Sequence, residues 1–143
     1  MSQHIVAKSI SVKAEPAKVW EALTNPEKTK NYFFHSRVLS DWQPGSTITF
    51  KGKMFYIIPF EMTGRILNVE PGRFLQYTLK NGKKDDASAG YSTVTETLTY
   101  ENGETLVSVT DDVGDGDDAG ERYHRSQKGW DKILSGLKKE VES

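Results

Sequence analysis

The residue with the clearest chemical potential is Glu96, a carboxylate inside a segment that has the pattern of a β-strand. Residues 91–100 alternate, with threonines at positions 93, 95, 97 and 99 and with Val94, Glu96 and Leu98 between them. Because successive side chains of a strand point to opposite faces, Glu96 should be buried beside its apolar neighbours. A buried carboxyl is costly unless it gains a partner or a water, or keeps its proton through a raised pKa.

Two kinds of role are open for Glu96. As a functional group it could hydrogen-bond a hydroxyl or amine of a ligand, or it could serve as a general acid or base. Alternatively, it forms a structural pair with an inward Arg or Tyr, or a bulge turns it out to solvent. A functional role requires open space around the carboxyl.

Aromatic residues could supply the walls of such a space. The candidates are Trp20, Tyr32, Phe33, Phe50, Tyr77 and Trp130. Any one of them alone is more simply explained as core packing, whereas together they could line a hydrophobic cavity. Tyr123 and Gln127 add polar groups that could orient a ligand beside Glu96. We therefore predict these nine residues as ligand-binding residues, and we assign no catalytic residue.

The other acidic and imidazole side chains give weaker signals. Asp111 lies near the end of a strand, on the parity of Val107 and Val109, and could mark the mouth of a polar cavity or cap the following turn. The acidic stretch 111–118 does not have the spacing of an EF-hand, and Asp117 or Asp118 is better explained as a helix N-cap. The three histidines are not paired at metal-ligand spacing. No metal site and no cofactor are predicted.

Composition excludes several classes of protein. The chain has 143 residues and a formal net charge of -1, and no basic cluster indicates a nucleic-acid partner. Cysteine is absent, so disulfides and thiolate chemistry are impossible. The N-terminus lacks a signal-peptide pattern, and no apolar run is long enough to span a membrane. These features predict a cytoplasmic protein with one domain, residues 1–143.

One long amphipathic helix is predicted over residues 117–141. Its apolar stripe has helical spacing and consists of Tyr123, Trp130, Ile133, Leu134, Leu137 and Val141. From Trp130 onward this stripe is continuous and should close the core, whereas Ser126 and Gln127 interrupt the first half. We expect a cavity beneath residues 123–130, and we expect Gly129 to permit close contact between helix and sheet.

The rest of the chain is predicted as strands and turns with two short helices. The helices open at Pro16 and, with Asn25 as N-cap, at Pro26. Strands are expected at 5–13, 37–42, 47–52, 73–80, 91–100 and 106–111, and one bent strand or two shorter ones at 53–69, with irregularities at Pro59 and Gly64. The polar segment 81–90 is expected to be a mobile loop. The fold class is therefore α+β, with one long helix lying on an antiparallel sheet.

Several segments resemble a known family. They are residues 19–27 (VWEALTNPE), Tyr32-Phe33, Asp41-Trp42, the Gly45-Ser46 turn with Ile48, Phe50 and Gly52, the set Gly64, Ile66, Leu67, Val69, Pro71, Leu75 and Tyr77, and Gly129-Trp130 with Leu134 and Leu137. In this order they closely resemble the family related to the activator of Hsp90 ATPase (homologue 1-like), within the START and Bet v 1-like (SRPBCC) superfamily. The resemblance implies a helix-grip fold, in which a curved antiparallel sheet of about six to seven strands wraps around a long C-terminal helix.

The resemblance implies a choice of functions. Members of the superfamily include carriers of lipids and hydrophobic ligands, polyketide cyclases and domains that contact a chaperone. We predict a protein that binds a small hydrophobic or amphipathic molecule between sheet and helix. The alternatives are a protein associated with an Hsp90-type chaperone and a cyclase-like or hydrolase-like enzyme. Whether the protein is a monomer or a dimer stays open.

Overall fold

The computed structural model describes residues 4–54, 58–80 and 90–143, and within these ranges seven strands form one antiparallel sheet. The strands are β1 (Ile5–Val12), β2 (Ser36–Ser40), β3 (Thr47–Met54), β4 (Ile58–Glu70), β5 (Phe74–Lys80), β6 (Tyr91–Glu101) and β7 (Glu104–Asp112). The helices are α1 (Pro16–Thr24), α2 (Pro26–Thr29) and α3 (Ala119–Glu142). This arrangement confirms the predicted fold class.

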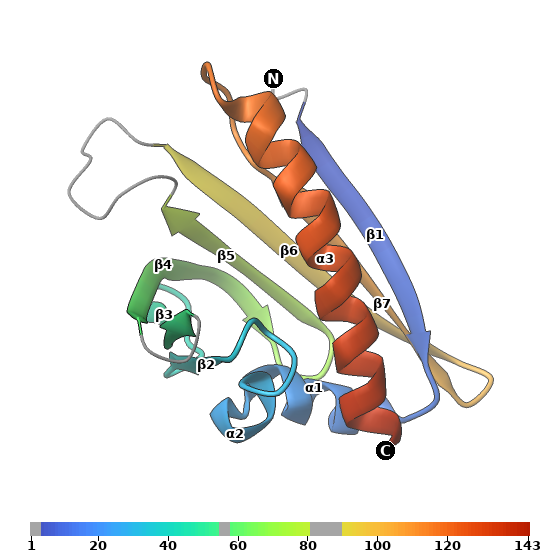
Figure 1. The fold of residues 1–143 in the computed structure, drawn as a ribbon. Helices are drawn as coiled ribbons and strands as arrows, with labels where there is room; N and C mark the ends of the chain where they lie inside the picture. The colour runs from blue at the N-terminus through green and yellow to red at the C-terminus, as the bar shows by residue number, and fades with distance from the viewer. Residues whose placement is uncertain (1–3, 55–57, 81–89) are drawn as a thin grey trace.

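The order of strands in the sheet is β1-β7-β6-β5-β4-β3-β2, so the first strand lies beside the last. Helix α3 runs along one face of the sheet over its β1 side, while β2, β3 and β4 curve away from it (Figure 1). The short helices α1 and α2 lie at the end of the sheet where α3 finishes (Figure 1). Helix α3 therefore covers the β1 side of the sheet but not its curved half.

Except in β4, the strands bury one parity and leave the other more exposed, as the alternation in the sequence predicts. On β6 the side chains of Ser92, Val94, Glu96 and Leu98 are buried against the helix side, and the threonines between them are half-buried or exposed. We call the helix-side surface of the sheet its inner face and the opposite surface its outer face.

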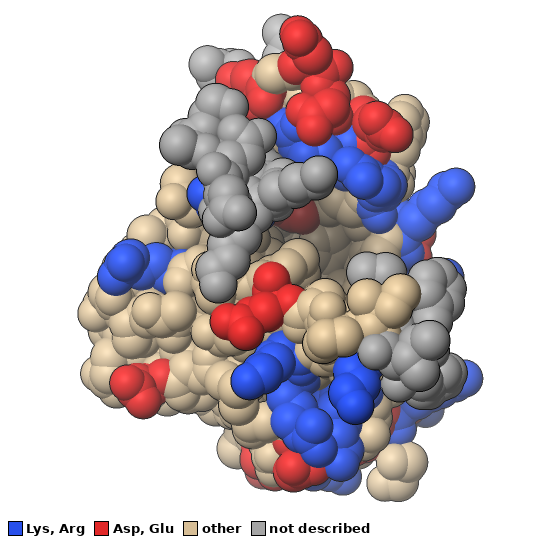
Figure 2. Space-filling model, turned by 60° about the vertical axis from the view of Figure 1, so that its left-hand side comes forward, with Lys and Arg blue, Asp and Glu red and all other residues tan. Residues whose placement is uncertain are grey.

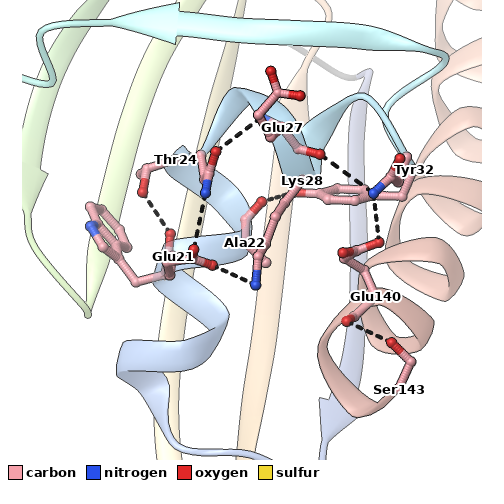
Figure 3. A network of polar contacts seen from close by, with 11 residues as sticks. Glu21, Ala22, Thr24, Glu27, Lys28, Tyr32, Glu140 and Ser143 are labelled. Carbon is pink, nitrogen blue, oxygen red and sulfur yellow. Dashed lines mark hydrogen bonds and ion pairs between the residues drawn. The ribbon is translucent and has the colours of Figure 1, made fainter.

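The two short helices begin as predicted. Pro16 and Pro26 each occupy the first turn of a helix, and the Asn25 side chain accepts a hydrogen bond of 2.9 Å from the backbone N–H of Glu27. After α2, the Tyr32 hydroxyl donates to the carbonyl of Ala22 at 2.7 Å, which ties the two helices together (Figure 3). This end of the molecule is thus closed by local polar contacts.

Helix α3 differs along its length. Its second half buries a continuous apolar stripe, namely Trp130, Ile133, Leu134, Leu137 and Val141, as predicted. In the first half, Tyr123, Ser126 and Gln127 on the same side are only half-buried. Asp118 occupies the N-cap, but its carboxylate pairs with the Arg122 guanidinium instead of capping a backbone N–H.

Several details of the sheet differ from the prediction. The β-bulge lies in β4 between Ile66 and Asn68, not at Gly64. Gly64 stays in register with Leu79, and a Cβ added there would lie 1.6 Å from the carbonyl oxygen of Thr78. Trp42 lies outside β2 with a positive φ of 56°. Residues 81–89 of the predicted mobile loop lie outside the described residues.

The close approach of α3 is at Gly136 and not at Gly129. A Cβ added at Gly129 would meet the Phe34 ring at 3.5 Å, an ordinary contact distance, so the prediction for Gly129 was wrong. A Cβ added at Gly136 would lie 2.6 Å from the Cβ of Tyr32 and 3.4 Å from its Cα. The absence of a side chain at Gly136 lets α3 pack directly on the segment that follows α2.

We expect Gly136→Ala to lower the free energy of unfolding by about 1–2 kcal/mol, because overpacking against Tyr32 outweighs the gain in helix propensity. Gly120→Ala in the same helix is the matched control, since nothing lies within 4 Å of its added Cβ. This control should raise stability by up to about 1 kcal/mol. Urea denaturation of both variants measures the difference. Equal effects of the two substitutions would show that α3 does not approach Tyr32 this closely.

Candidate functional site

Glu96 lies on the inner face of the sheet, as the alternation predicts. It pairs in register with Leu75 on β5 and with Val109 on β7, so no bulge turns it outward. Its residue surface is 5% exposed, and no group within the described ranges donates a hydrogen bond to its carboxyl. Neither of the structural explanations weighed from the sequence, a bulge or a hydrogen-bonded partner, accounts for this carboxyl.

Burial changes the acidity of Glu96. Desolvation raises its pKa from 4.5 to about 7. Tyr77 on β5 and Tyr32 after α2 have pKa values raised well above the usual range, first by burial and then by the negative charge of Glu96. Glu96 is therefore close to both phenols electrostatically. A carboxyl with this pKa can donate or accept a proton near neutral pH.

Four of the predicted aromatic residues form a continuous row beside the inner face. The ring of Tyr77 lies 5.8 Å from that of Phe50, and Phe50 lies 5.1 Å from Phe33. The Phe33 ring in turn lies 5.9 Å from the indole of Trp130, at nearly a right angle. The row therefore runs from the sheet to α3, and Tyr77, Phe50 and Trp130 are buried within it.

The remaining predicted site residues are placed differently. Trp20 is half-buried on α1 and packs against the hydrophobic core, but it is not one of the described ring–ring pairs that make up this row. The Tyr32 hydroxyl donates its proton to the Ala22 carbonyl, so it is not available to a ligand as a donor. Tyr123 is half-buried with its ring 6.1 Å from that of His4. Gln127 is half-buried, and its amide has no hydrogen bond to any described residue.

Asp111 has a role that the sequence did not reveal. Its Oδ2 accepts hydrogen bonds from Ser126 Oγ at 2.6 Å and from Trp130 Nε1 at 3.1 Å, both on α3. Burial raises the pKa of Asp111, and these two hydrogen bonds oppose the rise. The turn after β7 is capped by Asp112 instead, which accepts from the Gly114 N–H at 3.0 Å. The spacing of Ser126 and Trp130, four residues apart on one helical face, was the available signal.

Part of the inner face carries large apolar side chains that are not covered. Met62 on β4 pairs with Phe50 and shares its face, but it is 43% exposed whereas Phe50 is 1% exposed. Ile58, on the same parity of β4, and Phe34 after α2 are about half exposed. Figure 2 shows a hollow in this side of the molecule, with Lys and Arg side chains on both its upper and its lower rim and Asp and Glu side chains near them. The inner face is thus open toward β4 and closed toward β1.

Several grooves lined by described residues lie on the outer face and at the edges of the sheet. One of them, of about 620 Å³, is lined by His35, Arg37, Leu39, Lys51, Gly52, Lys53, Pro59, Phe60 and Glu61, and we call it the basic groove. Arg37 and Lys51 are direct cross-strand partners in it, a pairing of like charges. The cavity expected under the first half of α3 stays a prediction.

Among the described residues, no group of three or more His, Asp or Glu side chains is placed to hold a metal ion. None of the helices in these ranges is long and apolar enough to cross a membrane.

The raised pKa of Glu96 predicts a dependence of stability on pH. Below about pH 4.5 the carboxyl is protonated in both the folded and the unfolded chain, so its titration does not lower the free energy of unfolding. As the pH rises to about 7, the unfolded chain loses this proton first, so folding becomes less favourable by about 3 kcal/mol. Tyr77 and Tyr32, which face Glu96, stay neutral throughout this range because their pKa values are raised.

We therefore expect Glu96→Gln to be about as stable as the wild type at about pH 4.5 and more stable at about pH 8. Urea unfolding of both proteins at the two pH values measures this difference. Asp111 titrates in both proteins, so it cancels in the comparison. A difference that does not change with pH would mean that the Glu96 carboxyl is hydrated or paired.

Proteins of known structure resemble this chain over nearly its whole length. A solution structure of a protein from Cytophaga hutchinsonii is 34% identical, with a TM-score of 0.76, and the match covers 99% of this chain and 96% of that one. A crystal structure of a Mesorhizobium loti protein has 22% identity and a TM-score of 0.80, covering 96% of each chain. The Aha1 dimer from Colwellia psychrerythraea has 19% identity and a TM-score of 0.73, also over 96% of each chain. No curated protein matches the sequence.

These neighbours share the arrangement of one curved antiparallel sheet with a long C-terminal helix, which is the helix-grip fold of the START and Bet v 1-like superfamily. A family model described as "Activator of Hsp90 ATPase homolog 1-like protein" matches residues 13–142, nearly the whole chain. The chain therefore belongs to the family of activator of Hsp90 ATPase homolog 1-like proteins.

Proposed function

We propose that the protein binds a small hydrophobic or amphipathic molecule between the sheet and the first half of α3. The observation that carries this proposal is the buried Glu96 carboxyl, which lacks a hydrogen-bond partner among the described residues. A group of this kind is costly in an empty interior, and a ligand that bonds to it would remove the cost.

The surroundings of Glu96 support a binding role. The row of Tyr77, Phe50, Phe33 and Trp130 offers apolar contact area beside the carboxyl. Met62 and Ile58 leave apolar surface exposed on the inner face of β4, where a ligand could bury it. Apolar walls with one or two polar groups are the usual composition of a small-molecule site.

The half-buried residues of α3 would form the ligand's other wall. Tyr123 and Gln127 lie on the helix side that turns toward the sheet, and neither is fully buried. The Gln127 amide has no hydrogen bond to any described residue, so it could form one with a polar atom of the ligand. Together with Glu96, this amide would set the orientation of the ligand.

We expect Gln127→Trp to abolish binding by filling the space under α3. N-phenyl-1-naphthylamine, a neutral apolar dye, serves as the fluorescent probe, and native mass spectrometry of the purified protein detects any molecule that co-purifies. His124→Trp is the matched control, because His124 is exposed on the same helix, and this variant should bind as the wild type does. Weak binding of the dye by the wild type, or equal binding by both variants, would contradict the proposed cavity.

A second candidate function is association with an Hsp90-type chaperone, which the family's description and the Aha1 neighbour favour. The basic groove is a candidate contact surface, because Arg37, Lys51 and Lys53 could meet acidic side chains of a partner. Stimulation of the ATPase of the cell's own Hsp90 homologue tests this role. A Lys51→Glu, Lys53→Glu double variant should then lose the stimulation, and an unchanged ATPase at high wild-type concentration would exclude it.

A further inference from the structure

The charges on the inner face suggest which kind of molecule could bind there. Glu96 and Asp111 are both buried acidic residues on this face, and each has at least one carboxyl oxygen that no described residue donates to. Among the described residues of β2 to β7, no Lys or Arg occupies an inner-face position, as the strand registers show. The inner-face positions of these described strands therefore carry two acidic side chains and no Lys or Arg.

Two cations on the elements that flank these strands, Lys8 on β1 and Arg122 on α3, form ion pairs with other residues. Lys8 has inner-face parity on β1, but its ammonium lies 3.2 Å from Asp131, whose side chain is 63% exposed. Arg122, at the start of α3, donates to the carbonyl oxygens of Val113 and Asp115 and pairs with Asp118. Both cations thus have partners other than Glu96, although the Arg122 Nε is buried without a hydrogen-bond partner among the described residues.

This charge pattern distinguishes among ligand head groups. A carboxylate ligand would add a third negative charge to a site of low dielectric constant and would be repelled. A neutral hydroxyl could hydrogen-bond to Glu96, but such a bond contributes only about 1 kcal/mol net. An ammonium group would make a charge-assisted hydrogen bond, which is about twice as strong as a neutral one.

The aromatic row points in the same direction. Cations are attracted to the faces of Trp, Tyr and Phe rings, and aromatic cages are a common way to bind organic ammonium groups. Tyr77, the first ring of the row, is influenced by the charges of both Glu96 and Asp111. Carboxylates and ring faces in one buried region both attract an organic cation.

We propose that the ligand is an amphipathic organic amine, whose ammonium group pairs with Glu96 and whose apolar part lies along the Tyr77–Trp130 row toward the exposed inner face of β4. This inference rests on the proposed binding function and narrows it to one chemical class. The ligand's charge would supply the counter-ion that the described strands do not place on the inner face.

The test compares three probes that share one tail and differ in the head group: octylamine, octanol and octanoate, each competing with N-phenyl-1-naphthylamine at about pH 8. The wild type should bind octylamine about tenfold more tightly than octanol, and octanoate most weakly. This comparison uses only the wild-type protein, so it does not depend on whether a variant folds.

Two variants test whether the preference for octylamine over octanol depends on Glu96. Glu96→Gln should bind octanol within about twofold of the wild type but lose the preference for octylamine. Glu101→Gln is the matched control on the same strand, because Glu101 is exposed at the end of β6 and should leave the preference unchanged. Retained octanol binding also shows that the Glu96→Gln variant is folded.

The outcomes separate the two proposals. Equal binding of octanol and octylamine by the wild type would overturn the amine inference and leave the binding function standing. A preference for the amine that survives in Glu96→Gln would also overturn it, since the cation would then be held elsewhere. Failure of the dye and of all three probes to bind would contradict the binding function itself.

Discussion

The link between Asp111 and α3 is the interaction on which the arrangement of the interior depends. One carboxylate oxygen at the end of β7 accepts from both Ser126 and Trp130, so it fixes the height and the rotation of the helix over the sheet. The second half of α3 is held differently, by a continuous apolar stripe and by the close approach of Gly136 to Tyr32. Because a polar contact positions the first half, that half does not have to be fully packed to stay in place, and its inward side chains remain only half-buried.

The consequence is an interior with two regions of opposite character. Toward β1 and the C-terminal end of α3 the core is dry and apolar, with Val6, Val12 and Leu137 among its buried residues. Toward β4 the inner face is partly exposed, and the buried Glu96 carboxyl lies between the two regions without a hydrogen-bond donor from the described chain. A carboxyl whose pKa is raised to about 7 destabilises the folded protein at neutral pH, and groups with such shifted pKa values are enriched at functional sites in general.

The sequence predicted the features that depend on local periodicity. The inward direction of Glu96 follows from alternation on a single strand, and the starts of α1 and α2 follow from prolines and from the Asn25 cap. Contacts between distant segments could not be predicted in this way. The partners of Asp111 are 15 and 19 residues away and depend on the rotation of α3, and the close approach at Gly136 rather than Gly129 depends on where Tyr32 lies in space. For the same reason Trp20, which has the same residue type as Trp130, is not part of the aromatic row.

The central claim is that the Glu96 carboxyl faces a space that a ligand can enter. The most direct measurement is a crystal structure of the protein as purified, at a pH of about 8, where the carboxyl is largely ionised. We expect density for a bound molecule or for ordered water within hydrogen-bond distance of the Glu96 carboxyl, beneath residues 123–130 of α3. Side chains that fill this region completely, with a protein donor bonded to Glu96, would contradict it.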